Sequence, residues 1–332
     1  MRNVSLYLFA SVKGGVGKST LAVVTAELLA SRGRHPIVLD CDVLGSSLAD
    51  GLDLCAPETS TSGGRPDPMA PPTEQWFSLE RSRALREQRK ESWAVDGAER
   101  GLTIPPYIND ALFFDTSKGN DCRVDAMLWR NASTNGARYL PSSPIREEAS
   151  RAAVLLARSG PEFAWVRRIA WMIEGLLSED DSVTDIIVDL PPGTWGLTHE
   201  LLVFAGGLGR ALPQGYPQWE GSISWSVVPT IVTTPDRNDR LLALEYWLYA
   251  KSRIKSLRVL MNRAVHSDST YRAWIRDELP KPLRGLGYEK QVLLVPLLST
   301  SLGGMFVRGD LTLSDDVQDL SSSLLGKEAQ DA

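Results

Sequence analysis

Three short runs of this chain combine glycines, lysine, hydroxyls and carboxylates in patterns suited to phosphate chemistry. The first is Ser11-Val12-Lys13-Gly14-Gly15-Val16-Gly17-Lys18-Ser19-Thr20. Its glycines let main-chain N–H groups turn toward an anion, Lys18 can reach β- and γ-phosphates, and the Ser19 hydroxyl can bind Mg²⁺. A glycine-rich turn also occurs without any ligand, but the Gly-Lys-Ser ending favours phosphate binding.

The other two runs each follow an apolar stretch. Residues 36–39 lead into Asp40-Cys41-Asp42, and residues 186–188 lead into Asp189-Leu190-Pro191-Pro192-Gly193-Thr194. Carboxylates at strand ends can support a magnesium ion and orient a water for attack on a phosphoryl group. Gly193 offers an unhindered N–H to a γ-phosphate. Alone, the runs also fit solvated aspartates and a Pro-Gly turn; together with the glycine loop they favour a nucleotide site.

Positioning these runs requires a parallel sheet. Residues 4–40 read as strand, loop, helix and strand, which is one βαβ unit, and we expect its second strand to lie beside the first. Ligands bind at the carboxyl edge of such sheets. Further strands are expected at 124–129, 137–140, 227–234, 257–261 and 292–295, and helices at 147–158, 163–177 and 238–251. The predicted fold is α/β: a doubly wound, mostly parallel sheet flanked by helices.

The first run departs from the ordinary P-loop. Val12 stands where that pattern has its opening glycine, and Lys13 adds a second lysine. This resembles the deviant Walker A motif of the ParA/MinD/Mrp-type ATPases, a branch of the SIMIBI-class P-loop NTPases. The resemblance covers residues 4–55, about 137–205 and 227–310. It implies an ATP-dependent homodimer in which Lys13 reaches the partner's nucleotide, with slow hydrolysis of ATP to ADP and phosphate.

The resemblance also implies roles for individual residues. It assigns catalysis to Lys13, Lys18 and Asp42, with Asp42 orienting the attacking water. It assigns magnesium to Ser19, Asp40 and Asp189. It assigns nucleotide contacts to Gly14, Gly15, Val16, Gly17, Lys18, Ser19, Thr20, Gly193, Asn262 and Pro296, the adenine lying near Asn262 and Pro296. The Asn-Lys-x-Asp motif of GTPases is missing, so the expected cofactors are ATP and Mg²⁺.

Size and composition suit one P-loop domain spanning residues 1–332. The chain is 43% hydrophobic, enough for a core, and its net charge of -5 argues against a wholly nucleic-acid-binding surface. Three cysteines without a CxxC pair suit a reducing compartment, and we expect a cytoplasmic protein. No apolar run reaches the roughly 18 residues of a membrane span. His199-Glu200 lacks a second histidine at helical spacing and is interpreted as structural.

Two segments lie outside the resemblance, and we expect a protein partner to bind one of them. Residues 56–136 begin with a Pro-, Ser- and Gly-rich stretch, and a helix expected at 74–95 carries five basic residues within 81–90. A solvated helix face is the more frequent origin of such a run. Residues 206–226 form an aromatic, proline-rich loop, in which we expect an exposed Trp219 to serve a partner-binding lid.

Several functions remain open at this stage. The leading one is a ParA/MinD-like positioning or partition switch that controls a protein or DNA partner. Non-specific DNA binding would use the 81–90 run together with Lys251, Arg253, Lys255 and Arg258. The alternatives are a regulatory ATPase subunit of a mobile-element or defence complex, an Mrp-like iron–sulfur carrier, for which the cysteine pair is missing, and a kinase on the same scaffold.

Overall fold

The computed structural model describes most of the nucleotide-motif regions and part of the remainder. The described residues are 1–45, 48, 52, 54–55, 107–113, 127–131, 136–143, 149–150, 152–153, 164–194, 196–219, 221–254, 256–279, 288–296 and 324–325. The expected helix at 74–95, its basic run and most of the expected helix at 147–158 lie outside these ranges.

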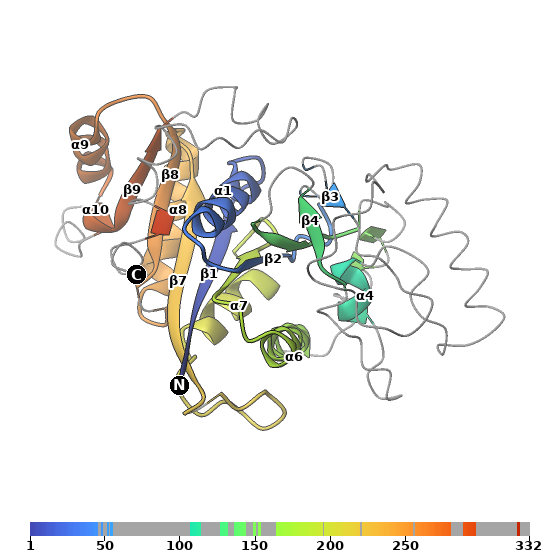
Figure 1. Cartoon of the computed structure of the whole chain (residues 1–332). Coiled ribbons are helices and arrows are strands. Elements are labelled where there is room, and N and C mark those ends of the chain that lie inside the picture. Colours follow the sequence, from blue (N-terminus) through green and yellow to red (C-terminus); the bar gives the residue numbers. More distant parts are fainter. Residues whose placement is uncertain are drawn as a thin grey trace.

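The described residues form one nine-stranded sheet in the order β3-β4-β5-β2-β6-β1-β7-β8-β9 (Figure 1). Its strands are β1 (Arg2–Ser11), β2 (Pro36–Asp40), β3 (Leu54–Cys55), β4 (Trp129–Asn131), β5 (Arg138–Leu140), β6 (Asp185–Asp189), β7 (Ile223–Thr233), β8 (Arg258–Ala264) and β9 (Val292–Pro296). The pairs are parallel except that β4 runs antiparallel to β3 and β5. The predicted fold class is thus confirmed.

Helices cover both faces of the sheet (Figure 1). They are α1 (Lys18–Ser31), α4 (Ile108–Phe113), α6 (Ala164–Glu179), α7 (Leu197–Ala205), α8 (Arg237–Ala250), α9 (Asp268–Glu278) and α10 (Tyr288–Gln291). Because side chains alternate along a strand, β1 contributes Leu6 and Leu8 to one buried cluster and Tyr7 and Phe9 to the other. Helix α1 packs in the second cluster, whereas α6 to α9 pack in the first.

One expected neighbour relation is wrong. Strand β2 does not lie beside β1, because β6 is inserted between them and pairs with both. The βαβ unit therefore skips one strand position. The consequence is chemical: Asp189, the last residue of β6, lies in register with Phe9 of β1 on one side and with Asp40 of β2 on the other.

Element boundaries elsewhere follow the sequence with some exceptions. The strands expected near 137–140, 227–234, 257–261 and 292–295 appear as β5, β7, β8 and β9, and the helices expected at 163–177 and 238–251 appear as α6 and α8. Of the strand expected at 124–129, Trp129 begins β4, Met127 and Leu128 precede it, and 124–126 lie outside the described residues. The sequence did not predict α9. No helix in the described ranges combines the length and apolar character needed to cross a bilayer.

The expectation of an exposed Trp219 is also wrong. Its side chain is only 5% exposed, its Nε1–H donates to the Glu174 carboxylate on α6, and its ring lies 5.0 Å from that of Trp225. Arg2, at the start of β1, pairs with Ile223, so the aromatic loop before β7 lies at the opposite end of the sheet from the glycine loop after β1. Its expected role in binding a partner stays a prediction.

The basic residues suggested for DNA binding are partly engaged within the fold. Arg258 is buried, and burial lowers its pKa to about 10. Its Nε–H donates to the Thr230 hydroxyl at 2.8 Å and its guanidinium also donates to the Leu324 carbonyl at 2.6 Å. Arg258 is therefore a core residue, contrary to its expected role. Lys251 lies over the Trp247 ring and Arg253 over a tyrosine ring.

Replacing Trp219 should test the structural role of the aromatic loop. We expect Trp219→Ala to lower the free energy of unfolding by about 3–5 kcal/mol, because it removes a buried indole. Trp171, 52% exposed on α6, provides the matched control, and Trp171→Ala should cost clearly less. Urea denaturation followed by circular dichroism measures both. Equal losses for the two variants would contradict the buried placement of Trp219.

Candidate functional site

The glycine loop leaves the start of α1 open to an anion. Gly15 and Gly17 have φ values of +78° and +88°, a region that glycine adopts without strain. Gly17 is the N-cap of α1, so no side chain caps the first main-chain N–H groups of the helix, and its first turn carries no acidic residue. Uncapped N–H groups and the helix dipole together favour phosphate at this point.

Asn262, at the end of β8, supports the glycine loop. Its amide Nδ2–H donates to the Val16 carbonyl at 2.9 Å. A Cβ on Gly17 would lie 2.3 Å from that Nδ2, so this close approach requires glycine. The structure thus brings Asn262 against the loop, whereas its expected contact with adenine stays a prediction. Pro296 ends β9 beside Ala264 of β8, at the same edge of the sheet.

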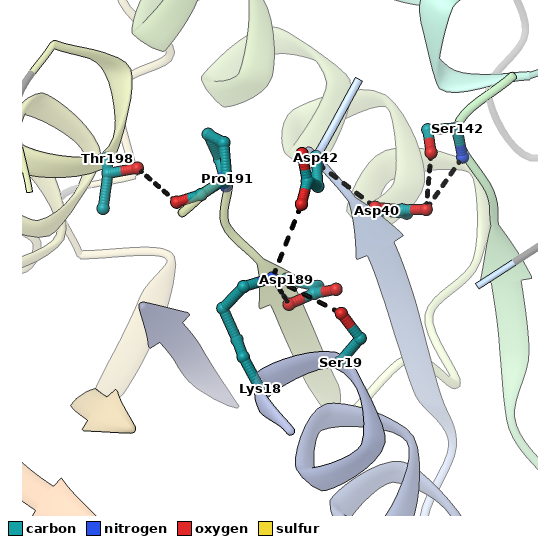
Figure 2. A network of polar contacts seen from close by, with 8 residues as sticks. All are labelled: Lys18, Ser19, Asp40, Asp42, Ser142, Asp189, Pro191 and Thr198. Carbon is teal, nitrogen blue, oxygen red and sulfur yellow. Dashed lines mark hydrogen bonds and ion pairs between the residues drawn. The ribbon is translucent and has the colours of Figure 1, made fainter. Parts of the chain in front are cut away.

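Lys18 is drawn to carboxylates at the carboxyl edge of the sheet (Figure 2). Its Nζ lies 2.5 Å from Asp189 Oδ1 and 4.0 Å from Asp42 Oδ2, and donates to the Ser19 hydroxyl at 3.4 Å. The Lys18 side chain is only 7% exposed. Residues predicted from three separate runs of the sequence therefore meet in one place.

Asp40 and Asp189 end neighbouring strands and are both fully buried. Burial, followed by the charge of Asp189, raises the pKa of Asp40 to about 7. Hydrogen bonds from Ser142 oppose that rise, because they stabilise the ionised form. Burial likewise raises the pKa of Asp189, although Lys18 counteracts it. One ammonium is too little positive charge for these buried carboxylates.

The donor set fits a magnesium ion. Asp189 Oδ2 is buried and has no hydrogen-bond partner within the described part of the chain, and the Ser19 hydroxyl lies beside the same carboxylate (Figure 2). A divalent cation would supply the charge that Lys18 alone does not. Within the described ranges, no group of three or more His, Cys, Asp or Glu side chains is arranged to hold a metal. Magnesium carried by a nucleotide needs fewer protein ligands, since phosphates and waters complete its shell.

Asp42 lies at the rim of this cluster. Burial raises its pKa, while Lys18 and main-chain hydrogen bonds from Gly45 and Leu44 act in the opposite direction. A Cβ on Gly45 would lie 3.0 Å from both carboxylate oxygens, so a larger residue there would require the Asp42 carboxylate to shift. The carboxylate is therefore held by its own loop while remaining near Lys18.

The loop after β6 is closed onto the glycine loop. The Gly193 N–H donates to the Ser11 carbonyl at 2.8 Å, with Gly193 at φ +101°. The Thr198 hydroxyl on α7 donates to the Pro191 carbonyl at 2.9 Å (Figure 2). In this arrangement the N–H of Gly193, expected to contact a γ-phosphate, is bonded within the chain.

The second lysine is held by an internal carboxylate. Lys13 Nζ lies 3.1 Å from Asp239 Oδ1 on α8, and Asp239 Oδ2 accepts from the Thr234 hydroxyl at 2.6 Å. The Lys13 side chain is nevertheless 61% exposed. To reach a second subunit, it would have to leave this pair.

Sequence reasoning missed two residues of the site. Ser142 donates to Asp40, and Asp239 holds Lys13. Both follow a strand that the sequence did predict, within the Pro-Ser-Ser turn after β5 and the first turn of α8. Hydroxyls and carboxylates just beyond the carboxyl ends of predicted strands were the available signal.

Comparisons with known proteins agree with the fold. Residues 3–97, which are 95 of the 332, match the sequence model of the ParA family described as NUBPL iron-transfer P-loop NTPase. No curated protein matches the sequence. Among solved structures, a ParA family ATPase from Chlorobium tepidum superposes with a TM-score of 0.51 at 15% identity, covering 97% of this chain and 98% of that one.

A second solved structure, apo McdA from Cyanothece, gives a TM-score of 0.53 at 16% identity, over 99% of this chain and 100% of that one. An ATP complex of a McdA variant gives 0.50 at 16% identity, over 100% and 96%. The chain has the fold of the ParA-type P-loop NTPases. The resemblance stated from the deviant Walker A motif is thereby confirmed.

The raised pKa of Asp40 predicts how stability depends on pH. The folded protein keeps a proton on Asp40 up to about pH 7, whereas the unfolded chain releases it near its ordinary pKa of 3.8. The folded state thus binds more protons between these values, and the stability of the ligand-free protein should fall as pH rises through that window. Thermal melts from pH 4 to 8 measure this, and Asp40→Asn should flatten the profile. A wild-type profile identical to that of Asp40→Asn would contradict the raised pKa.

Proposed function

We propose that this protein is an ATP-binding, slowly hydrolysing molecular switch that dimerises on ATP and controls a protein or DNA partner. The observation that supports this most is the convergence of Lys18, Asp189 and Asp42 at the uncapped start of α1. The ATP-bound state of a McdA variant with the same fold supports the choice of nucleotide.

The chain's own residues divide the work as follows. Main-chain N–H groups of the glycine loop bind the phosphates, and Lys18 turns from Asp189 toward them. Asp189, Ser19 and Asp40 would hold Mg²⁺, which supplies charge neutralisation for the transferred phosphoryl group. Asp42 orients the attacking water. Gly193 exchanges its bond with Ser11 for a phosphate oxygen, which makes the loop after β6 sensitive to hydrolysis.

Dimerisation in this proposal uses Lys13. Its pair with Asp239 is intramolecular, with the ammonium more than half exposed. The Asp239 side chain is only 6% exposed, but it keeps the hydrogen bond from the Thr234 hydroxyl when Lys13 leaves, so Lys13 can exchange Asp239 for a phosphate of the facing subunit. A homodimer with two nucleotides between its subunits would then assemble only when ATP is present.

We propose that the partner binds the 56–136 segment, because Trp219 of the aromatic loop 206–226 is buried in the core and is not available to a partner. A regulatory subunit of a multi-protein complex remains the second form of this proposal, and non-specific DNA binding would depend on the residues of 81–90. The matching family model is described as an iron-transfer NTPase, which favours the alternative that this protein is an iron–sulfur carrier. Cys41 is buried with a raised pKa, and the sequence has no CxxC pair, so the switch is favoured.

Molar mass in solution tests the switch. By light scattering, wild type should be monomeric without nucleotide and dimeric with MgATP. Lys18→Ala should stay monomeric because phosphate binding is lost, and Lys13→Ala should bind ATP yet remain monomeric. Asp42→Ala should accumulate as the ATP-loaded dimer. Its rate of ATP hydrolysis should fall about tenfold or more, because the attacking water is no longer oriented.

Lys251→Ala serves as the basic-residue control, since Lys251 lies at the opposite end of α8 from Asp239, and this variant should leave the ATP-dependent mass unchanged. Hydrolysis by Asp42→Ala at the wild-type rate would refute the catalytic assignment. An ATP-dependent dimer formed equally well by Lys13→Ala would refute the role of the second lysine.

A further inference from the structure

Asp40 is held almost entirely by one residue that lies outside the three nucleotide motifs. Its Oδ2 accepts from the Ser142 hydroxyl at 2.6 Å and from the Ser142 main-chain N–H at 3.2 Å, and its Oδ1 accepts from the Asp42 N–H at 3.1 Å (Figure 2). Among the described residues, Ser142 thus supplies two of the three hydrogen bonds to the Asp40 carboxylate. Because Asp40 is fully buried, no bulk water replaces a lost donor.

The residues before and after Ser142 are both hydrogen-bonded to α4. The Ile108 N–H donates to the Pro141 carbonyl at 2.9 Å, and the Ser143 N–H donates to Asn109 Oδ1 at 2.8 Å. Ser142, Ser143, Ile108 and Asn109 are all at most 3% exposed. The turn after β5 is therefore fixed by one hydrogen bond before Ser142 and one after it.

Helix α4 belongs to the 56–136 segment, and its apolar side chains pack in the core. Ile108 and Leu112 are buried in the cluster that contains α6, and the Arg168 guanidinium on α6 donates to the Leu112 carbonyl. Asn109 is kept there although its Nδ2 is buried and has no hydrogen-bond acceptor among the residues that the structure describes. A buried amide with one unsatisfied donor is unfavourable for stability alone, which points to its Oδ1 contact as the reason for the residue.

We propose that Ser142 is a positioning residue that orients Asp40 toward the magnesium ion, and that α4 holds Ser142 in place through Asn109. Helix α4 is thereby coupled to the nucleotide site. Coupling between two sites is reciprocal, so a partner that binds α4 would alter magnesium-dependent nucleotide binding, and the nucleotide would alter affinity for that partner. This inference rests on the proposed nucleotide function.

The test is equilibrium binding of a fluorescent ATP analogue to the full chain, first in EDTA and then across a magnesium titration. Outer-shell partners of metal ligands typically change metal affinity 10–100-fold when removed. Ser142→Ala should therefore raise the magnesium concentration needed for half-maximal binding about tenfold, with affinity in EDTA unchanged. Ser142→Thr, which keeps the hydroxyl, should recover most of the wild-type magnesium dependence.

Asn109→Leu removes the contact to Ser143 without touching Asp40, and should shift the magnesium dependence in the same direction by a smaller factor. Thr25→Ala is the control: Thr25 is a buried hydroxyl on α1 that donates to the Leu21 carbonyl, and its loss should shift nothing. Circular dichroism melts establish that each variant is folded.

The outcomes separate the claims. An unchanged magnesium dependence in folded Ser142→Ala overturns the positioning role and leaves the proposed function intact. A shift in Ser142→Ala but none in Asn109→Leu overturns the coupling through α4. A wild type that binds the analogue neither in EDTA nor in magnesium overturns the proposed function and this inference with it.

Discussion

The site depends on one electrostatic constraint: three carboxylates share a single ammonium at the buried carboxyl edge of the sheet. Lys18 pairs with Asp189 and Asp42 and acts electrostatically on Asp40, while burial raises the pKa of all three carboxyls. Such an arrangement is unfavourable unless protons or a cation balance it. This excess of negative charge lies next to the uncapped main-chain N–H groups at the start of α1. A magnesium nucleotide would neutralise the carboxylates with its cation and accept hydrogen bonds from the N–H groups with its phosphates.

Sheet order is what creates this constraint. With β6 between β1 and β2, Asp189 faces the glycine loop on one side and Asp40 on the other. Had β2 lain beside β1, as the βαβ reading suggested, Asp40 would have taken that central place. Strand β5 pairs parallel to β2 with Leu140 in register with Leu39, which places the turn containing Ser142 beside Asp40.

Much of this could be predicted because the chemistry is local in sequence. Residue types alone predict the glycine loop, the two carboxylate runs and their apolar strands, and the structure brings Lys18, Ser19, Asp42 and Asp189 together as expected. Contacts between distant segments could not be predicted in this way. Ser142 with Asp40, Asp239 with Lys13, and Trp219 with Glu174 each join elements whose order in the sheet no single-sequence pattern fixes.

The aromatic loop illustrates the limit of composition as a guide. Tryptophans outside regular elements are typical of interfaces, yet Trp219 and Trp225 pack together at the end of the sheet away from the phosphate loop. Helix α4 is the opposite case, a six-residue element from an unremarkable stretch that contacts the turn next to Asp40. Position in the fold, rather than residue type, decides which segment can influence the site.

A crystal structure of the protein with Mg²⁺ and a non-hydrolysable ATP analogue tests the central claim most directly. The account predicts that Lys18 Nζ leaves Asp189 for the phosphates, and that the buried Asp189 Oδ2 gains the magnesium ion or one of its waters as a partner. Analogue density in the glycine loop with the Lys18–Asp189 pair still closed at 2.5 Å, or no density there at saturating analogue, would contradict it.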